Sequence, residues 1–147
     1  MIWCAAPSCL QRRHDATMNV VQWMRDNHIT PSLEFCFTQL LQKGADLSFT
    51  STTSKCVNPL VREAGQQLDA IGFMNFFRGR LSSLWLRVQD SYMLRKHVPT
   101  RRRGKSWTAS FIRQLYGWSR SMWNHCNDII HRRDAASKEM VLLSDTE

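Results

Sequence analysis

The sequence predicts an all-α fold of four to five helices in an irregular bundle. Apolar side chains recur every three or four residues through most of the 147-residue chain, and no segment has the pattern of a strand. The chain is 43% hydrophobic and 22% charged, which suits a single domain with one buried core. No apolar run approaches the roughly 18 residues of a membrane span.

The domain organisation follows from where this periodicity begins and ends. We expect a loosely ordered lead-in over residues 1–15, a single helical domain over residues 16–134, and a flexible acidic tail over residues 135–147. Cysteines are odd in number and scattered, and no export signal is recognisable, so we expect reduced thiols and an intracellular protein.

The first two helices are predicted on either side of residue 29. Apolar spacing predicts one helix over residues 16–28. Thr30 followed by Pro31 is typical of a helix start, because threonine caps the free amides and proline suits the first turn. Gly44 is expected to end this second helix.

A loop and a third helix come next. Six of the nine residues 47–55 are Ser or Thr, so residues 45–58 are expected to form a long loop. Asn58 and Pro59 repeat the cap-and-proline pattern and predict a helix that runs through Ile71.

The middle of the chain predicts a short aromatic segment and a further helix. Three phenylalanines lie between Gly72 and Gly79, which indicates a turn or a short helix that packs aromatic rings. From Arg80 the apolar spacing is again helical, and Pro99 ends the segment.

The last helix is expected over residues 106–132 with Ser106 as its N-cap. One apolar stripe with steps of three and four residues runs along it, on the side opposite to Arg113 and Arg120. The stripe consists of Trp107, Phe111, Leu115, Trp118, Met122, Cys126 and Ile129.

The positive charge of the chain is concentrated in one segment. The net charge is +8, and residues 74–134 alone contain thirteen basic and three acidic side chains, eleven of the basic ones being arginine. Arginine binds phosphate in a bidentate manner and stacks on aromatic rings, so this half is suited to nucleic acid. The run at 100–105 also resembles a nuclear import signal, which favours a nuclear location over a cytoplasmic one.

We therefore predict phosphate contacts with RNA or DNA from the basic run and from the last helix, and no membrane partner. The alternative is that these charges form an ordinary solvated surface. The predicted contact residues are Arg101, Arg102, Arg103, Lys105, Arg113, Arg120, Asn127, His131, Arg132 and Arg133.

No cofactor, metal site or catalytic group is predicted. Cys4, Cys9 and His14 provide three soft ligands, one fewer than a structural zinc site needs. Cys36 and Cys126 have no adjacent base and are interpreted as small buried apolar residues.

One local pattern leaves a catalytic alternative open. Asn127 and His131 lie one helical turn apart and resemble the HEPN ribonuclease signature, in which an arginine precedes the asparagine. Here Cys126 occupies the arginine position, so the resemblance implies a degenerate ribonuclease fold that has lost catalysis.

A second resemblance covers roughly residues 16–133. The order of tryptophan and glycine residues resembles uncharacterised proteins of microbial eukaryotes that are associated with mobile elements and often lie downstream of a reverse transcriptase. The residues that carry it are Val21, Trp23-Met24, His28, Thr30-Pro31 and Leu33 upstream, and then Ile71-Gly72-Phe73, Phe76, Gly79-Arg80, Ser83, Trp85, Gln89, Tyr92, Arg103-Gly104, Trp107, Leu115, Met122-Trp123, Asn127 and His131.

The sequence therefore predicts a non-enzymatic nucleic-acid-binding helical protein derived from a mobile element. Three alternatives remain: a HEPN-like ribonuclease that uses His131 and Asn127, a helical protein-interaction module, or a remnant without a function. An interaction module would associate through helix faces, with Trp3, Trp23 and the Phe73–Phe77 cluster as candidate contact residues.

Overall fold

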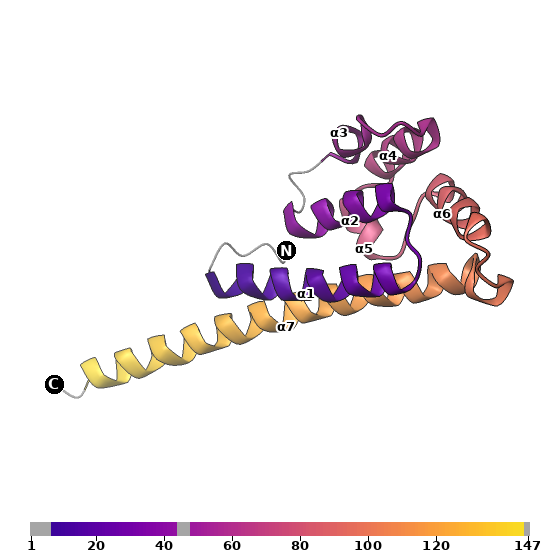
Figure 1. Ribbon diagram of the computed structural model, residues 1–147. Helices are drawn as coiled ribbons and strands as arrows, with labels where there is room; N and C mark the ends of the chain where they lie inside the picture. Colours follow the sequence, from indigo (N-terminus) through magenta and orange to yellow (C-terminus); the bar gives the residue numbers. More distant parts are fainter. Residues whose placement is uncertain (1–6, 44–47, 146–147) are drawn as a thin grey trace.

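The protein is all-helical, as the sequence predicts. The computed structural model describes residues 7–43 and 48–145, and no strand lies among them. Five helices have thirteen residues or more, and two short helices and one 3-10 turn connect them (Figure 1). In order they are α1 (Pro7–Asp26), α2 (Pro31–Lys43), α3 (Phe49–Thr53), α4 (Pro59–Ile71), α5 (Phe73–Phe77), α6 (Ser83–Arg95), η2 (Thr100–Arg102) and α7 (Lys105–Ser144).

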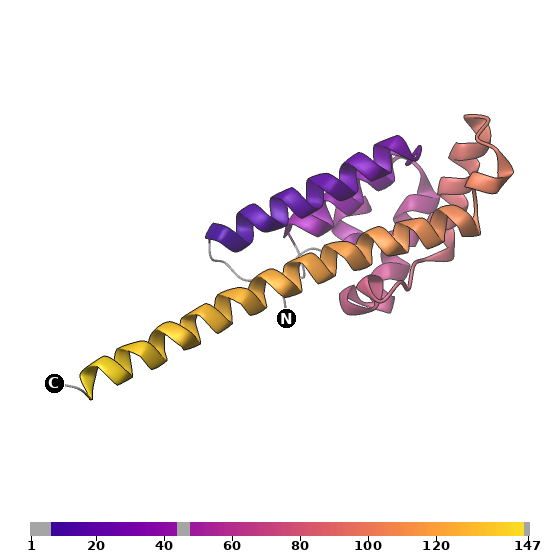
Figure 2. The same cartoon turned by 90° about the horizontal axis from the view of Figure 1, so that it is seen from below.

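Helices α1 and α7 lie side by side in opposite directions (Figures 1 and 2). The Nε1 of Trp107 donates to the carbonyl of Asn27 at 3.0 Å, and the Nε1 of Trp118 donates to the Thr17 hydroxyl at 3.1 Å. These two bonds set the antiparallel register of the two helices. The end of α1 at Asn27 lies beside Trp107 near the start of α7, and Thr17 lies beside Trp118 further along α7.

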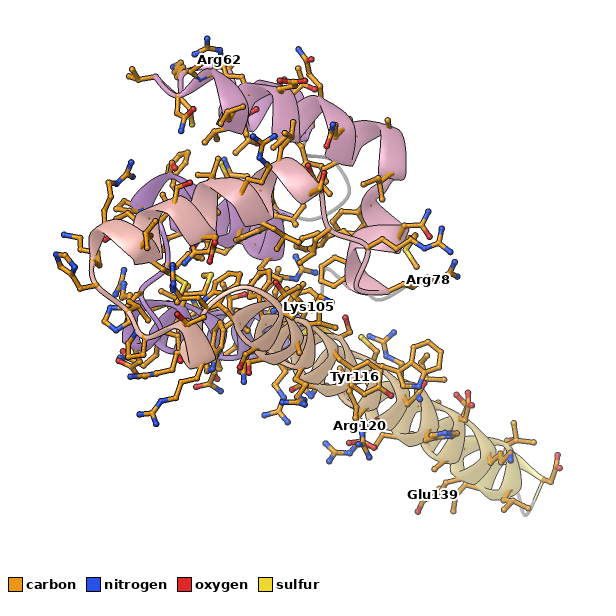
Figure 3. All side chains as sticks on the ribbon, turned by 90° about the vertical axis from the view of Figure 1, so that its right-hand side faces the viewer. Arg62, Arg78, Lys105, Tyr116, Arg120 and Glu139 are labelled. Carbon is orange, nitrogen blue, oxygen red and sulfur yellow. The ribbon has the colours of Figure 1, made fainter. Side chains whose placement is uncertain are left out.

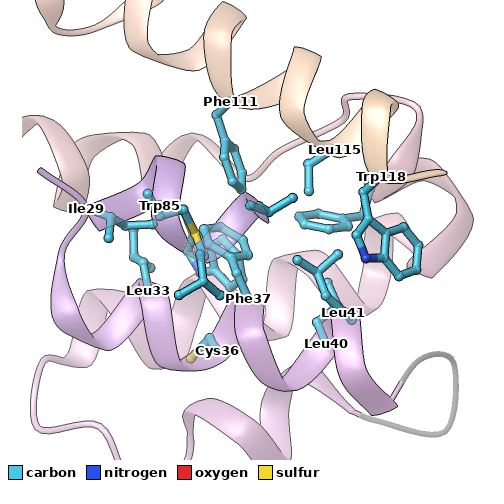
Figure 4. Close-up of a cluster of buried hydrophobic side chains, with 14 of the residues drawn as sticks. Ile29, Leu33, Cys36, Phe37, Leu40, Leu41, Trp85, Phe111, Leu115 and Trp118 are labelled. Atoms are coloured by element: carbon cyan, nitrogen blue, oxygen red, sulfur yellow. The ribbon is translucent and has the colours of Figure 1, made fainter. Parts of the chain in front are cut away.

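The core lies where α2, α6 and α7 meet (Figure 4). Phe37 of α2 is at its centre, with ring centroids 4.5 Å from Trp85 of α6 and 4.7 Å from Phe111 of α7. All three side chains are almost fully buried. Removing each of them from water contributes about 2–3 kcal/mol to folding, so this aromatic cluster connects the two halves of the sequence.

Side-chain caps lie at the starts of α4 and α6, and the one at α4 was predicted. The Asn58 side chain accepts from the amide of Leu60 at 3.0 Å, with Pro59 in the first turn of α4. Ser82 accepts in the same way from Leu84 at the start of α6. The predicted start of α4 is thus confirmed, as are the short helix at Phe73–Phe77 and the proline at the start of α2.

Both ends of the described chain are more helical than expected. Helix α1 begins at Pro7, so residues 7–15 are not a loose lead-in, and Cys9 is fully buried. Helix α7 continues to Ser144, twelve residues past its expected end, where residues 135–144 were expected to be a flexible tail. The reason is compositional: residues 135–143 contain good helix formers and neither Gly nor Pro.

The expected loop at 45–58 contains a helix. Asp69 of α4 accepts hydrogen bonds from the amides of Phe49 and Thr50, both at 2.9 Å, and from the Ser48 hydroxyl. This carboxylate satisfies the free amides at the start of α3, and α3 packs on α4 through Gly65, where a Cβ would lie within 2.9 Å of the Phe49 carbonyl oxygen. A residue twenty positions away thus turns a Ser/Thr-rich segment into a helix.

Two smaller expectations are also wrong. Ser106 is not the N-cap of α7, because the helix begins at Lys105 after Gly104, which has a φ of 57° and no side-chain cap. Trp23 is not an exposed association surface: it packs on Trp107 and Phe111, and Phe76 is fully buried. Trp3, Cys4 and Gly44 lie outside the described residues.

No helix in the described ranges is long and apolar enough to cross a membrane.

Candidate nucleic-acid interface

The basic side chains of residues 74–134 lie on the surface. Twelve of the thirteen are exposed, and Arg103 is half-buried. Within the described ranges the single ion pair joins Arg25 to Glu34 at 2.7 Å, far from this segment in sequence. None of these thirteen cations is therefore paired with a described carboxylate, and their field acts outward on solvent.

The ten predicted contact residues do not form one patch. Arg113, Arg120 and Asn127 are spaced by seven residues and His131 follows one turn later, so all four share the face of α7 opposite to the buried stripe. Arg132 and Arg133 follow His131 directly and therefore point to other sides of the helix, at about 100° per residue. From Lys105 to Arg133 the helix rises by about 42 Å.

The beginning of α7 borders a hollow of about 560 Å³ between α6 and α7. Leu86, Trp107 and Ile112 contribute apolar side chains to its wall, while Arg87, Lys105 and Asp90 contribute charged ones. The four free amides at the start of α7 and the positive end of its dipole lie at the same place, which favours an anion there.

A second hollow of about 580 Å³ lies between the end of α5 and α7. It is lined by Phe77, Arg78, Ile112, Arg113 and Tyr116, and Ile112 also lines the first hollow, so the two adjoin. Among the residues that the structure describes, no acidic side chain lines the second hollow.

Gly79 brings Arg78 close to α7. Its φ is +83°, and a Cβ at this position would lie 3.1 Å from a methyl carbon of Ile112. A glycine is therefore needed both for the left-handed turn after α5 and for the close approach to α7. Figure 3 shows Lys105, Tyr116 and Arg120 in succession along α7, Arg78 beside them, and Arg62 on the opposite side of the molecule.

Arg78 and Tyr116 were not among the predicted contact residues. Tyr116 is 64% exposed and lies three residues after Arg113, so the two side chains are neighbours on the helix surface. That spacing is visible in the sequence, and an exposed aromatic beside an arginine is a usable signal. Arg78 is 35 residues from Arg113 in the chain and could not have been placed without the turn at Gly79.

The residues of the HEPN-like pattern lie elsewhere. Asn127 is half-buried and His131 is exposed, and other residues line the two hollows. No three His, Cys, Asp or Glu side chains of the described ranges are grouped as metal ligands, and Cys4 lies outside those ranges. The degenerate ribonuclease stays a prediction.

Cys36 has the chemistry of a core residue. It is fully buried, and burial, followed by the neighbouring Cys56 thiol, raises the pKa of Cys36 to about 12. The thiol is therefore neutral at physiological pH, whereas a nucleophilic cysteine has to be a thiolate. This agrees with its interpretation as a small apolar residue.

Comparison with protein-family models, with curated proteins and with solved structures gives no match. The mobile-element origin therefore stays a prediction from the tryptophan and glycine pattern.

Proposed function

We propose that this protein binds single-stranded RNA or DNA without enzymatic action through a basic surface beside the start of α7. We define the α5–α7 surface as the two adjoining hollows, the exposed ring of Tyr116 and the basic side chains around them: Arg78, Arg87, Arg101, Arg102, Arg103, Lys105, Arg113 and Arg120. The observation that carries the proposal is the second hollow, where Arg78 and Arg113 flank an exposed tyrosine and no carboxylate of the described chain lines the wall.

The chemistry of this arrangement suits an unpaired strand. Arginine side chains neutralise phosphates and release counterions, which gives affinity without sequence preference. An exposed aromatic ring stacks on a base of any type, at about 1–3 kcal/mol per base. Tyr116 can reach a base in this way only if the base is unpaired, so single strands should bind more tightly than duplexes.

Binding of a labelled single strand and of a duplex across a salt series tests the proposal. We expect the double variant Arg78→Gln, Arg113→Gln to weaken binding about tenfold or more and to reduce the slope against salt, because about two phosphate contacts are lost. The matched control is Lys43→Gln with Lys55→Gln, which removes the same charge from α2 and from the segment after α3. Equal losses in both double variants would contradict the proposed surface.

Tyr116→Ala separates stacking from charge. We expect it to weaken single-strand binding by about 1–3 kcal/mol and to leave duplex binding and the salt slope unchanged. If wild-type protein does not bind either nucleic acid at low salt, the basic segment is a solvated surface and the proposal fails.

A further inference from the structure

Helix α7 extends well beyond the helical body. The hydrogen bonds Asn27–Trp107 and Thr17–Trp118 set the antiparallel register of α1, so its first residue, Pro7, lies near residue 128 of α7. Residues 129–144, which we call the arm, continue for about 24 Å past that point. Both views show this last part of α7 projecting away from the other helices (Figures 1 and 2).

The arm exposes large apolar side chains. All of its residues after Ile129 are exposed, and Ile130, Met140 and Val141 each have more than half of their surface in water. A soluble helix with this much apolar surface is normally covered by another element.

The spacing of the arm is that of a coiled coil. The steps of four and three residues that run through Trp118 and Met122 in the body continue through Ile129, Arg133, Ala136 and Met140. This spacing keeps its period of 3.5 residues after the body ends, which is the pattern of a helix that pairs with another helix. Ile129 and Met140 are its large apolar residues in the arm, Arg133 and Ala136 lie between them, and Ile130 and Val141 lie about 100° to one side.

We propose that the arm pairs with the arm of a second copy of this chain, in antiparallel orientation. In a parallel pair each Arg133 would face Arg133 of the second copy inside the seam, where two like charges repel. In the antiparallel register that places Ile129 opposite Met140 of the second copy, Arg133 instead lies opposite Ala136, whose small side chain leaves room for it.

The charges beside the stripe select the same orientation. The antiparallel register brings Arg132 of one copy next to Glu139 of the other, and the twofold symmetry makes this pair twice. In a parallel pair Arg132 would face Ser137 and gain no ion pair. Arg132 and Glu139 are seven residues apart in one chain, too far for a direct contact on the same helix.

A charge exchange tests this pairing by sedimentation equilibrium over a range of protein concentrations. The wild-type mass should rise from 17.2 kDa towards twice that value. Arg132→Glu and Glu139→Arg should each weaken the association about tenfold, because each creates two like-charge contacts. The double variant Arg132→Glu, Glu139→Arg should regain the wild-type association, because both ion pairs form again with their signs exchanged.

Lys138→Glu is the matched control. It changes the charge by the same amount as Arg132→Glu, but it lies about 140–180° around the helix from the stripe and should leave the association unchanged. All three positions are exposed, so the variants keep the helical content of the body in circular dichroism. A monomeric wild type at every concentration, or a double variant no better than the single ones, would overturn the proposal. Neither result bears on nucleic-acid binding.

Discussion

The two parts of α7 make the most instructive comparison in this molecule. In residues 105–128, Trp107, Phe111, Leu115, Trp118 and Met122 are buried against the other helices. In residues 129–144 the same spacing continues, yet none of the side chains is buried. One helix with one periodic pattern is thus a core element over its first part and a projecting arm over its second. The pattern specifies a helix with an apolar face, and other segments decide whether this chain covers it.

The largest expected effect compares one apolar residue from each part. Phe111→Ala should lower the free energy of unfolding by about 3–5 kcal/mol, because it opens a cavity beside Phe37 and Trp85. Met140→Ala, with 71% of its residue surface exposed, should change it by no more than about 0.5 kcal/mol. Urea unfolding at low protein concentration measures both. Comparable losses would mean that the arm folds back on its own body.

Two helical glycines sharpen the comparison within the body. Gly65→Ala should destabilise the protein by about 1–3 kcal/mol, because a methyl group there would press on Thr53 and the Phe49 carbonyl between α3 and α4. Gly117→Ala on the exposed side of α7 should stabilise it by up to about 1 kcal/mol, because nothing lies within 4 Å of the added carbon. Thermal unfolding of the two variants should therefore give shifts of opposite sign. Two shifts of the same sign would contradict the close contact of α3 and α4.

The smallest expected effect concerns Asp69. Burial raises the pKa of its carboxyl, but the hydrogen bonds from Thr50, Phe49 and Ser48 outweigh burial and leave the pKa below its ordinary value. A carboxylate with a lowered folded pKa stabilises the protein above its unfolded pKa, and this contribution is lost as pH falls through the folded value.

Asp69→Asn should therefore cost about 1 kcal/mol at neutral pH, as the loss of a helix cap does. The difference from wild type should shrink as the pH is lowered towards 3 and below. Asp134→Asn in the arm, with no such network, is the control and should not change the stability at neutral pH. A difference between Asp69→Asn and wild type that is constant with pH would exclude the capping role of the carboxylate.

The sequence alone was sufficient for elements whose signals are local. Asn58 and Pro59 specify the start of α4 because a capping side chain and a proline act on the amides next to them. The apolar stripe of α7 specifies the face that is buried, since residues at steps of three and four must lie on one side of a helix. The exposure of the basic side chains of residues 74–134 could also be predicted this way, because arginine is rarely buried without a partner.

Distant partners decided the remaining features. Asp69 caps α3 from α4, which turned an expected loop into a helix. The amide and hydroxyl of Thr30 both donate to the buried side-chain oxygen of Gln89, 59 residues away, so a residue interpreted as a local cap joins the start of α2 to α6. Such bonds depend on which segments become neighbours, and no pattern within a few residues contains that information.

The candidate site likewise has some features that the sequence predicts and others that only the fold determines. Composition identified a basic segment, and the spacing of Arg113 and Arg120 placed them on one helix face. The fold alone brought Arg78 to Tyr116, through a left-handed glycine that lets the end of α5 approach α7. Charge and periodicity are properties of the chain and can be recognised in it. The hollow and the uncovered arm arise from the packing of whole helices, which depends on the burial of the core as a unit.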